Sequence, residues 1–321
     1  MTKVAVLDDW QGVAKQSADW SRLLQRAEVV FFEEPFASPD KLADALAGFS
    51  IIVAMRERTR FPKALIERLP SLRMIALTGG RTWTMDFDAL NARGIIVSHT
   101  GGTHSTATTA ELTLGLLLSA ARYIPNADAS MREGAFQGGV PVGQVLEGKT
   151  LGVIGLGKIG SKMARYGQAL GMRVFAWSQN MTEEKAAAAG AKLVDKITLL
   201  TESDAISLHL VLAERTRGII GAQELALMKP GAILVNSSRG PLVDEAALVE
   251  RLRTGKLIAA LDVYEQEPLP AGHPLRNLPN TVLTPHLGYC AREVYSQFYG
   301  DSVENVLAFL DGKPMRVLKG T

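Results

Sequence analysis

A glycine-rich turn of the form Gly-x-Gly-x-x-Gly lies near the middle of the sequence. It spans Gly155-Leu-Gly157-Lys-Ile-Gly160, follows the apolar run Leu151–Ile154, and leads into a helical pattern that Gly171 can end with a left-handed cap. The first glycine permits the tight turn, the second lets a pyrophosphate approach the backbone, and the third lets helix and strand pack closely. Because the helix N-terminus presents free amides, we expect a dinucleotide here. The residues expected to bind it are Gly155, Gly157, Lys158, Ile159 and Gly160.

The residue after the next strand bears on which dinucleotide binds. That strand is expected over residues 173–177, and an Asp or Glu after it would hold the ribose hydroxyls of the adenosine. The sequence has Ser178 instead, followed by Gln179 and Asn180. No carboxylate repels a 2′-phosphate, and no arginine in the turn attracts one. We therefore expect NAD(P), leaning toward NADP and bound in part by Ser178 and Gln179; looser binding of NAD is the alternative.

The elements that position these residues alternate between strands and helices. Strands are expected at 4–7, 29–32, 51–54, 74–77 and 95–97, and a second series at 151–154, 173–177, 192–194, 205–208, 232–235, 257–261 and 281–283. The runs are apolar throughout, as in parallel sheets covered by helices on both faces. The fold class is therefore α/β, with two doubly wound parallel-sheet domains.

Three connecting segments complete this organisation. Thr108-Thr-Ala-Glu111 is a capping-box pattern that predicts an apolar helix over about 109–122, buried between domains or at a subunit contact. Residues 134–143 are rich in glycine and are expected to form a loop. The last helix is expected over about 291–311, after the final strand, and is long enough to return to the first unit.

Composition and charge exclude several classes of protein. A chain of 321 residues, 47% apolar, fits two domains with buried cores and excludes disorder. With 35 basic and 33 acidic residues and no run of like charges, we expect small-molecule partners, no nucleic acid and no membrane. The single cysteine, Cys290, excludes an intrachain disulfide and a cysteine-based zinc site, so no metal site is expected. With neither a signal peptide nor a membrane span recognisable, we expect a soluble, cytoplasmic protein.

Several motifs together resemble the D-2-hydroxyacid dehydrogenases, the family that includes phosphoglycerate dehydrogenase, glyoxylate/hydroxypyruvate reductase and D-lactate dehydrogenase. In the family's order they are Ala110-Glu111, Gly148–Gly160, Asn236–Gly240, Leu261–Pro268 and Thr284–Gly288. The likeness is close from about Leu112 onward and lies mainly in pattern before it. It implies a Rossmann dinucleotide-binding domain over 102–286, inserted into a flavodoxin-like substrate domain formed by 1–101 and 287–321. It further implies hydride transfer between a nicotinamide cofactor and a D-2-hydroxy acid/2-keto acid pair, and a homodimer is expected.

The resemblance assigns the chemistry to three residues. Reducing a 2-keto acid needs a cation for the carboxylate, a proton donor for the developing alkoxide and a hydride source. Arg239 would grip the carboxylate with its fork of donors. His286 would donate the proton, with Glu267 behind it to orient the imidazole and keep it protonated. Each of the three follows an expected strand, where sites form in open α/β sheets.

The resemblance also assigns binding residues. Asp262 would lie at the nicotinamide carboxamide, and His209 would line the cofactor groove, although Val211 replaces the proline usual after that histidine. The loop Thr78-Gly79-Gly80-Arg81 would offer amides to the substrate carboxylate, and Arg56 lies in the loop 55–60 that borders the pocket. The family's Gly-x-Gly-x-Asp is replaced here by a segment that brings Arg81 and Trp83 near the site. A solvated basic edge formed by Arg56, Arg58 and Arg60 is the alternative for the arginines.

Two other functions fit the same scaffold. One is a nucleotide-sensing, corepressor-like binding protein, which Arg239, Glu267 and His286 do not exclude and which turnover of keto acids would. The other is a phosphite-type oxidation, which also uses Arg, Glu and His. Formate oxidation is disfavoured because it would call for Gln in place of Glu267.

Overall fold

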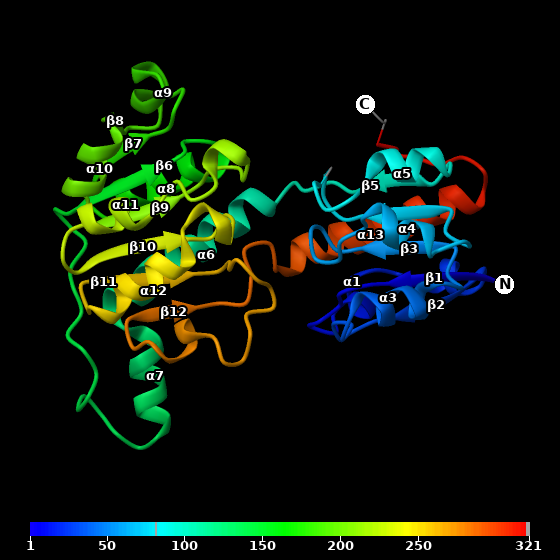
Figure 1. The fold of residues 1–321 in the computed structure, drawn as a ribbon, viewed down its shortest axis with the longest axis horizontal. Coiled ribbons are helices and arrows are strands. Elements are labelled where there is room, and N and C mark those ends of the chain that lie inside the picture. Colours follow the sequence, from blue (N-terminus) through cyan, green and yellow to red (C-terminus); the bar gives the residue numbers. More distant parts are fainter. Residues whose placement is uncertain (81, 319–321) are drawn as a thin grey trace. The chain divides into compact units, whose positions relative to one another are not determined.

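The chain forms two compact α/β units in the computed structural model, which describes residues 1–80 and 82–318 (Figure 1). Unit 1 comprises Met1–His104 and Cys290–Thr321, and unit 2 comprises Ser105–Tyr289. These divisions lie three residues after the expected boundaries at 101 and 286. Which ligand each unit binds stays a prediction.

Unit 1 is built on a five-stranded parallel sheet with the order β2-β1-β3-β4-β5. Its strands are β1 (Thr2–Val6), β2 (Ala27–Phe31), β3 (Ile51–Ala54), β4 (Met74–Leu77) and β5 (Ile96–His99). This is the flavodoxin-like order, in which the direction of winding reverses between β1 and β3. The expected strands are confirmed, and β3 and β4 match their predicted bounds because both are fully buried apolar runs.

The helices of unit 1 include one from the far end of the chain. They are α1 (Ala14–Ser17), α2 (Ser21–Leu24), α3 (Pro39–Leu46), α4 (Lys63–Glu67), α5 (Phe87–Ala92) and α13 (Arg292–Leu310). The helix expected near the C-terminus is α13, and it packs on α1, β4 and β5. Beyond it, the amide of Leu318 donates to the carbonyl of Val97 in β5 (2.8 Å), so both stretches of unit 1 share one hydrogen-bonded sheet edge.

Unit 2 is built on a seven-stranded parallel sheet with the order β12-β11-β10-β9-β6-β7-β8. Its strands are β6 (Thr150–Ile154), β7 (Arg173–Trp177), β8 (Lys192–Leu193), β9 (Ala205–Leu208), β10 (Ala232–Asn236), β11 (Leu257–Leu261) and β12 (Thr281–Leu283). The first six strands of this unit follow the Rossmann order, and β12 extends it by one. The winding reverses between β6 and β9, which is where such sheets bind dinucleotides.

The helices of unit 2 cover both faces of this sheet (Figure 1). They are α6 (Ser105–Arg122), α7 (Ile124–Arg132), α8 (Lys158–Ala169), α9 (Glu183–Ala188), α10 (Lys196–Glu202), α11 (Ala222–Leu227) and α12 (Glu245–Arg253). Three short 3-10 turns are η1 (Glu214–Thr216), η2 (Gly240–Leu242) and η3 (Pro274–Asn277). Among the described residues, no helix combines the length and apolarity needed to cross a membrane.

Two features of the connecting segments differ from the sequence predictions. The capping box at Thr108 is wrong, because α6 already begins at Ser105 and the hydroxyl of Thr109 donates to the Ser105 carbonyl (2.8 Å). The buried side of α6 packs on β10, β11 and α8 within unit 2. The helix α7 was not predicted; Pro125 lies in its first turn, a position where proline is compatible with a helix.

Candidate active site

The glycine turn forms a cradle between β6 and α8. A Cβ atom at Gly160 would overlap the carbonyl oxygen of Gly155, and one at Gly155 would lie 2.7 Å from the carbonyl oxygen of His209. At Gly157, the N-cap of α8, nothing lies within 4 Å of a Cβ position. Since Gly157 and Lys158 are exposed, the amides of the helix N-terminus face open space. This shape and polarity fit the pyrophosphate of a dinucleotide.

Ser178 lies beside this cradle, directly after β7. The amide of Gly155 donates to the carbonyl of Trp177 (2.9 Å), which ties the turn to the last residue of β7. Ser178 is half-buried and Gln179 is exposed. The strand end therefore lies where the sequence predicted it, and no carboxylate occupies the position after it.

His209 follows β9. Its backbone carbonyl lies close to Gly155 of the cradle, 2.7 Å from where a Cβ atom of that residue would be. Its Nε2 atom lies 2.8 Å from the hydroxyl of Ser207, and its Nδ1 atom is buried with no hydrogen-bond partner within the described chain. Burial lowers the pKa of His209 to about 3, so the ring is neutral at physiological pH. In place of the missing proline, the Thr216 hydroxyl holds this loop by donating to the carbonyl of Val211 (2.8 Å).

A histidine–carboxylate pair lies at the carboxyl ends of β11 and β12. Glu267 Oε2 and His286 Nδ1 are 2.6 Å apart, and these side chains are only 22% and 16% exposed. The other oxygen, Oε1, accepts the amide of Tyr264 (3.0 Å), so the carboxylate is fixed on both sides. A ring held at Nδ1 keeps Nε2 as the atom that can exchange a proton with a reactant.

Arg239 follows β10, the neighbour of β11 in the sheet. Asn236 shapes its turn, accepting the amide of Ser238 at Oδ1 (3.1 Å) and donating from Nδ2 to the carbonyl of Arg239 (3.0 Å). A side chain at Gly240 would overlap the backbone of Tyr264, so the Arg239 turn packs directly on the segment that carries Glu267. Arg239, Glu267 and His286 thus follow three adjacent strands. Asn236 is a positioning residue that the sequence reasoning missed; an Asn at a strand end was the available signal.

Asp262 holds the segment that carries His286. Its Oδ1 accepts the amide of Leu287 (2.7 Å) and the hydroxyl of Thr284 (2.6 Å), and its Oδ2 accepts the amide of Gly288 (2.8 Å). His286 itself has a φ of +57°, a left-handed conformation that is costly for a non-glycine residue. Burial raises the pKa of Asp262, which is fully buried. The carboxylate is thus a support for the histidine loop, and the expected contact with the cofactor stays a prediction.

In unit 1, the structure brings Arg56 and the loop after β4 together. The amide of Arg56 donates to the hydroxyl of Thr78 (3.0 Å), and its guanidinium lies 3.2 Å from a Cβ position at Gly79, whose φ is +80°. The amides of Thr78 and Gly79 already donate, to the carbonyl of Ala54 (2.9 Å) and the hydroxyl of Thr100 (2.8 Å). Gly80 follows in the same loop, and Arg81 lies outside the described residues.

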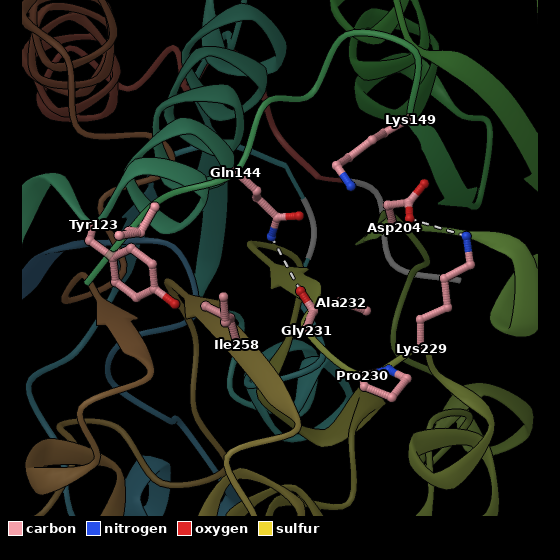
Figure 2. A pocket seen from close by; sticks show the side chains of 10 residues that line it. Tyr123, Gln144, Lys149, Asp204, Lys229, Pro230, Gly231, Ala232 and Ile258 are labelled. Carbon is pink, nitrogen blue, oxygen red and sulfur yellow. Dashed lines mark hydrogen bonds and ion pairs between the residues drawn. The ribbon is translucent and has the colours of Figure 1, made fainter.

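A separate pocket of about 210 Å³ lies at the amino ends of β9, β10 and β11 in unit 2 (Figure 2). Asp204 in its wall accepts Lys229 Nζ (3.1 Å) and the amide of Thr150 (2.8 Å), and Gln144 donates to the carbonyl of Gly231 (3.2 Å). Sites in open α/β sheets form at the carboxyl ends of strands, so we assign no part of the reaction to this pocket. Within the described ranges, no cluster of His, Cys, Asp and Glu could hold a metal ion.

Known proteins resemble this chain in sequence and in fold. The sequence profile of the family described as "D-isomer specific 2-hydroxyacid dehydrogenase, NAD binding domain" matches residues 114–288. A glyoxylate reductase of Aeropyrum pernix is 42% identical over 257 residues, which cover 78% of this chain and 76% of that protein. A D-3-phosphoglycerate dehydrogenase of Archaeoglobus fulgidus is 40% identical over 265 residues, 82% of this chain and 50% of that protein.

A solved structure extends the likeness to unit 1. The phosphoglycerate oxidoreductase of Vibrio cholerae O395 has a TM-score of 0.91 at 36% identity, covering 97% of this chain and all of that one. The chain spans about half the length of the archaeal phosphoglycerate dehydrogenases that it resembles. The family profile, the relatives and the two sheets point the same way. The chain belongs to the D-isomer-specific 2-hydroxyacid dehydrogenase family.

Proposed function

We propose that this protein is an NAD(P)-dependent oxidoreductase that interconverts D-2-hydroxy acids and 2-keto acids, acting on the CH–OH group of the donor. The observation that carries the proposal is the 2.6 Å pair of Glu267 and His286, which follow β11 and β12, the two strands that come after β10 in the sheet; β10 in turn leads into the turn of Arg239. Transfer of a proton to a keto oxygen requires an oriented imidazole as the donor, and the neighbouring carboxylate of the substrate requires a cation such as a guanidinium.

In this proposal each residue performs one task in keto-acid reduction. Arg239 binds the carboxylate and polarises the keto oxygen through its planar fork of N–H donors. His286 donates a proton from Nε2 to that oxygen as negative charge develops on it. Glu267 accepts a hydrogen bond from Nδ1–H and stabilises the charged ring, and Asp262 holds the loop in which the ring lies. In the opposite direction, His286 accepts the proton of the substrate hydroxyl.

The cofactor of this reaction is a nicotinamide dinucleotide, which supplies or accepts the hydride when bound. The cradle at Gly155, Gly157 and Gly160 would hold its pyrophosphate, and Ser178 would meet the adenosine ribose. Because Ser178 brings no negative charge, we infer that NADPH is used at least as well as NADH. Ser178→Asp tests this: a charge beside the 2′-phosphate costs ~1 kcal/mol or more, so NADPH binding should weaken and NADH binding should not. Unchanged NADPH affinity would place the 2′-phosphate elsewhere.

Substrate recognition is assigned to unit 1, through Arg56 and the loop of Thr78, Gly79, Gly80 and Arg81.

We also propose a homodimer, because α7 has no buried side chain and Ile124, Met131 and Phe136 are exposed along one stretch of the chain. Sedimentation equilibrium of the purified chain tests this, and a monomer at micromolar concentration would contradict it. A cytoplasmic location is proposed from the single cysteine, as the sequence suggested.

The direct test is a panel of 2-keto acids against both cofactors. Glyoxylate, hydroxypyruvate, pyruvate and bulkier 2-keto acids are reduced with NADH or NADPH while absorbance at 340 nm is followed. We expect turnover of at least one acid, and a loss of about 10²–10⁴ in kcat for His286→Asn with unchanged cofactor binding. Cofactor binding without turnover of any acid would instead support the corepressor-like alternative.

A further inference from the structure

The side chain of Tyr264 lies where β11 and β12 end. Its hydroxyl donates to the carbonyl of Thr284 (2.9 Å) and lies 3.2 Å from the carbonyl of Leu261. Leu261 is the last residue of β11, and Thr284 directly follows β12. The Leu261 carbonyl also accepts the amide of Thr284 (2.9 Å), which continues the pairing of the two strands. The tyrosine hydroxyl therefore joins the two strand ends from which the segments of the proposed active site begin.

Tyr264 also contacts the segments that carry the three residues of the proposed reaction. Its amide donates to Oε1 of Glu267 (3.0 Å). The Thr284 carbonyl that accepts its hydroxyl accepts the amide of His286 as well (3.0 Å). Its backbone packs directly against the turn that follows Arg239. One residue thus contacts the chain beside each of the three.

Burial keeps the hydroxyl of Tyr264 in its donor form. The residue is only 7% exposed, and burial raises the pKa of its hydroxyl, as do the negative charges of Asp262 and Glu267. The group therefore stays protonated throughout the pH range of an enzyme assay. The Leu261 and Thr284 carbonyls each accept an amide too, so the hydroxyl adds a second hydrogen bond that fixes the direction in which these carbonyls point.

The ring of Tyr264 is held by the apolar core of unit 2. It belongs to the same buried cluster as Leu242, Leu269 and Leu275, which come from the turn after Arg239 and from the segment after Glu267. Close packing of this kind fixes the rotamer of a ring, so the hydroxyl has a defined position. Phenylalanine would keep the packing and lose only the hydroxyl.

We propose that Tyr264 is a positioning residue for proton transfer. Its amide holds the carboxylate of Glu267 while its hydroxyl holds the chain that presents His286, so one residue sets the distance between the two side chains. The inference rests on the proposed function, in which this pair carries the proton. Tyr264 acts through the pair and needs no contact with substrate or cofactor.

The test compares Tyr264→Phe with wild type in kcat, KM for a 2-keto acid, the pH profile of the rate and the Kd of NADH. Loss of the hydroxyl lets His286 move relative to Glu267, so kcat should fall about 5-fold or more while KM and Kd stay within about 2-fold. The pH profile should shift toward lower pH, since a looser pair stabilises the protonated ring less. In the Glu267→Gln background, Tyr264→Phe should cause no further shift, because the ion pair is already lost. An additional shift of the same size would place the effect outside the pair and overturn the proposal.

Two matched controls distinguish positioning from a general loss of stability. Asn280 precedes β12, and its Nδ2 donates to the carbonyls of Leu252 (2.9 Å) and Leu257 (2.7 Å). Asn280→Ala therefore also removes a donor shared by two carbonyls, but at the amino ends of β11 and β12, and should lower Tm without changing kcat or the pH profile. Tyr123→Phe removes a hydroxyl from the pocket at that same edge and should change none of these quantities. Equal falls in kcat for Asn280→Ala and Tyr264→Phe would overturn the proposal, as would a Tyr264→Phe enzyme with the wild-type kcat and profile.

A second readout does not depend on turnover. If the wild type reduces no 2-keto acid, the proposed function fails, and NMR titration of the histidine side chains replaces the kinetics. The spectrum of His286→Asn identifies the signal of His286 among the five histidines. A titration midpoint that is lower in Tyr264→Phe by about 0.3 pH unit or more supports the positioning role, and equal midpoints overturn it.

Discussion

At the scale of single residues, the contact between Glu267 and His286 leads to a prediction about pH. Glu267→Gln replaces a charge 2.6 Å from Nδ1 with a neutral amide, so the protonated imidazole is stabilised less. Because reduction needs the protonated ring, the profile of rate against pH should shift toward lower pH. The control is Glu265→Gln, since Glu265 is exposed and should leave the profile unchanged. A Glu267→Gln enzyme with the wild-type rate and profile would show that the pair has no part in proton transfer.

Asp262 leads to a second prediction at this scale. Asp262→Asn turns an N–H₂ group toward an amide of Leu287 or Gly288, and each hydrogen bond to a charged group is worth ~1.5–3 kcal/mol. We expect a lower Tm and a fall in kcat of about 10-fold or more, since the loop of His286 loses its support. Asp244→Asn serves as the control, because asparagine caps α12 as well as aspartate does. A lower Tm with an unchanged kcat would assign Asp262 to stability alone.

The roles of these residues show where sequence reasoning ends. Arg239, Glu267 and His286 could be named because each belongs to a motif at the end of an apolar run. The supports of these residues could not be predicted, since Asp262 meets Leu287 and Gly288 only once β11 and β12 lie side by side. For the same reason, the sequence does not predict the hydrogen bond that the hydroxyl of Thr59 donates to Asp8, fifty-one residues away (2.9 Å).

At the scale of elements, apolar runs predicted the strands well because each central strand is covered on both faces. Strand β9, for example, is fully buried and has its predicted bounds. Helix ends were harder to predict. The start of α6 was misplaced because the Ser and Thr residues before Thr108 do not stop a helix. Within the helix, the hydroxyls of Thr109 and Thr113 donate to the carbonyls four residues earlier, those of Ser105 and Thr109. The short α7 has no buried face, so it shows no apolar periodicity.

The contact of α8 with β6 gives a prediction for an element. Gly160→Ala forces a methyl group into the carbonyl of Gly155, so α8 must move away from the cradle. We expect NADH and NADPH binding to weaken by at least about 10-fold, together with a lower Tm. Gly115→Ala is the matched control, because nothing lies within 4 Å of that Cβ position and alanine favours a helix by ~1 kcal/mol. Equal cofactor affinity in the two variants would contradict the close packing of α8 on the turn.

At the scale of the whole molecule, Asp8 makes stability depend on pH. Burial raises the pKa of Asp8 in the folded protein to about 6, above the ordinary 3.8. At a pH between these two values, the native state therefore keeps a proton that the unfolded chain has released. The stabilisation is complete below pH ~4 and is lost as pH rises through about 6, by ~1–2 kcal/mol after allowance for partial exposure. Asp8→Asn cannot ionise. Its Tm should therefore rise relative to wild type between pH 4.5 and pH 7.5, and a constant difference across that range would contradict the assignment.

The two-part construction of unit 1 has a consequence for the order in which the protein folds. On a ribosome, all of unit 2 emerges before α13, whose Phe298 and Tyr299 are fully buried in unit 1. Unit 2 is one continuous stretch and can fold during synthesis, whereas the first 104 residues must wait for their last helix. During that wait the apolar surface of β4 and β5 that later contacts α13 is uncovered. Nascent unit 1 is therefore the part of this protein that most needs protection by chaperones.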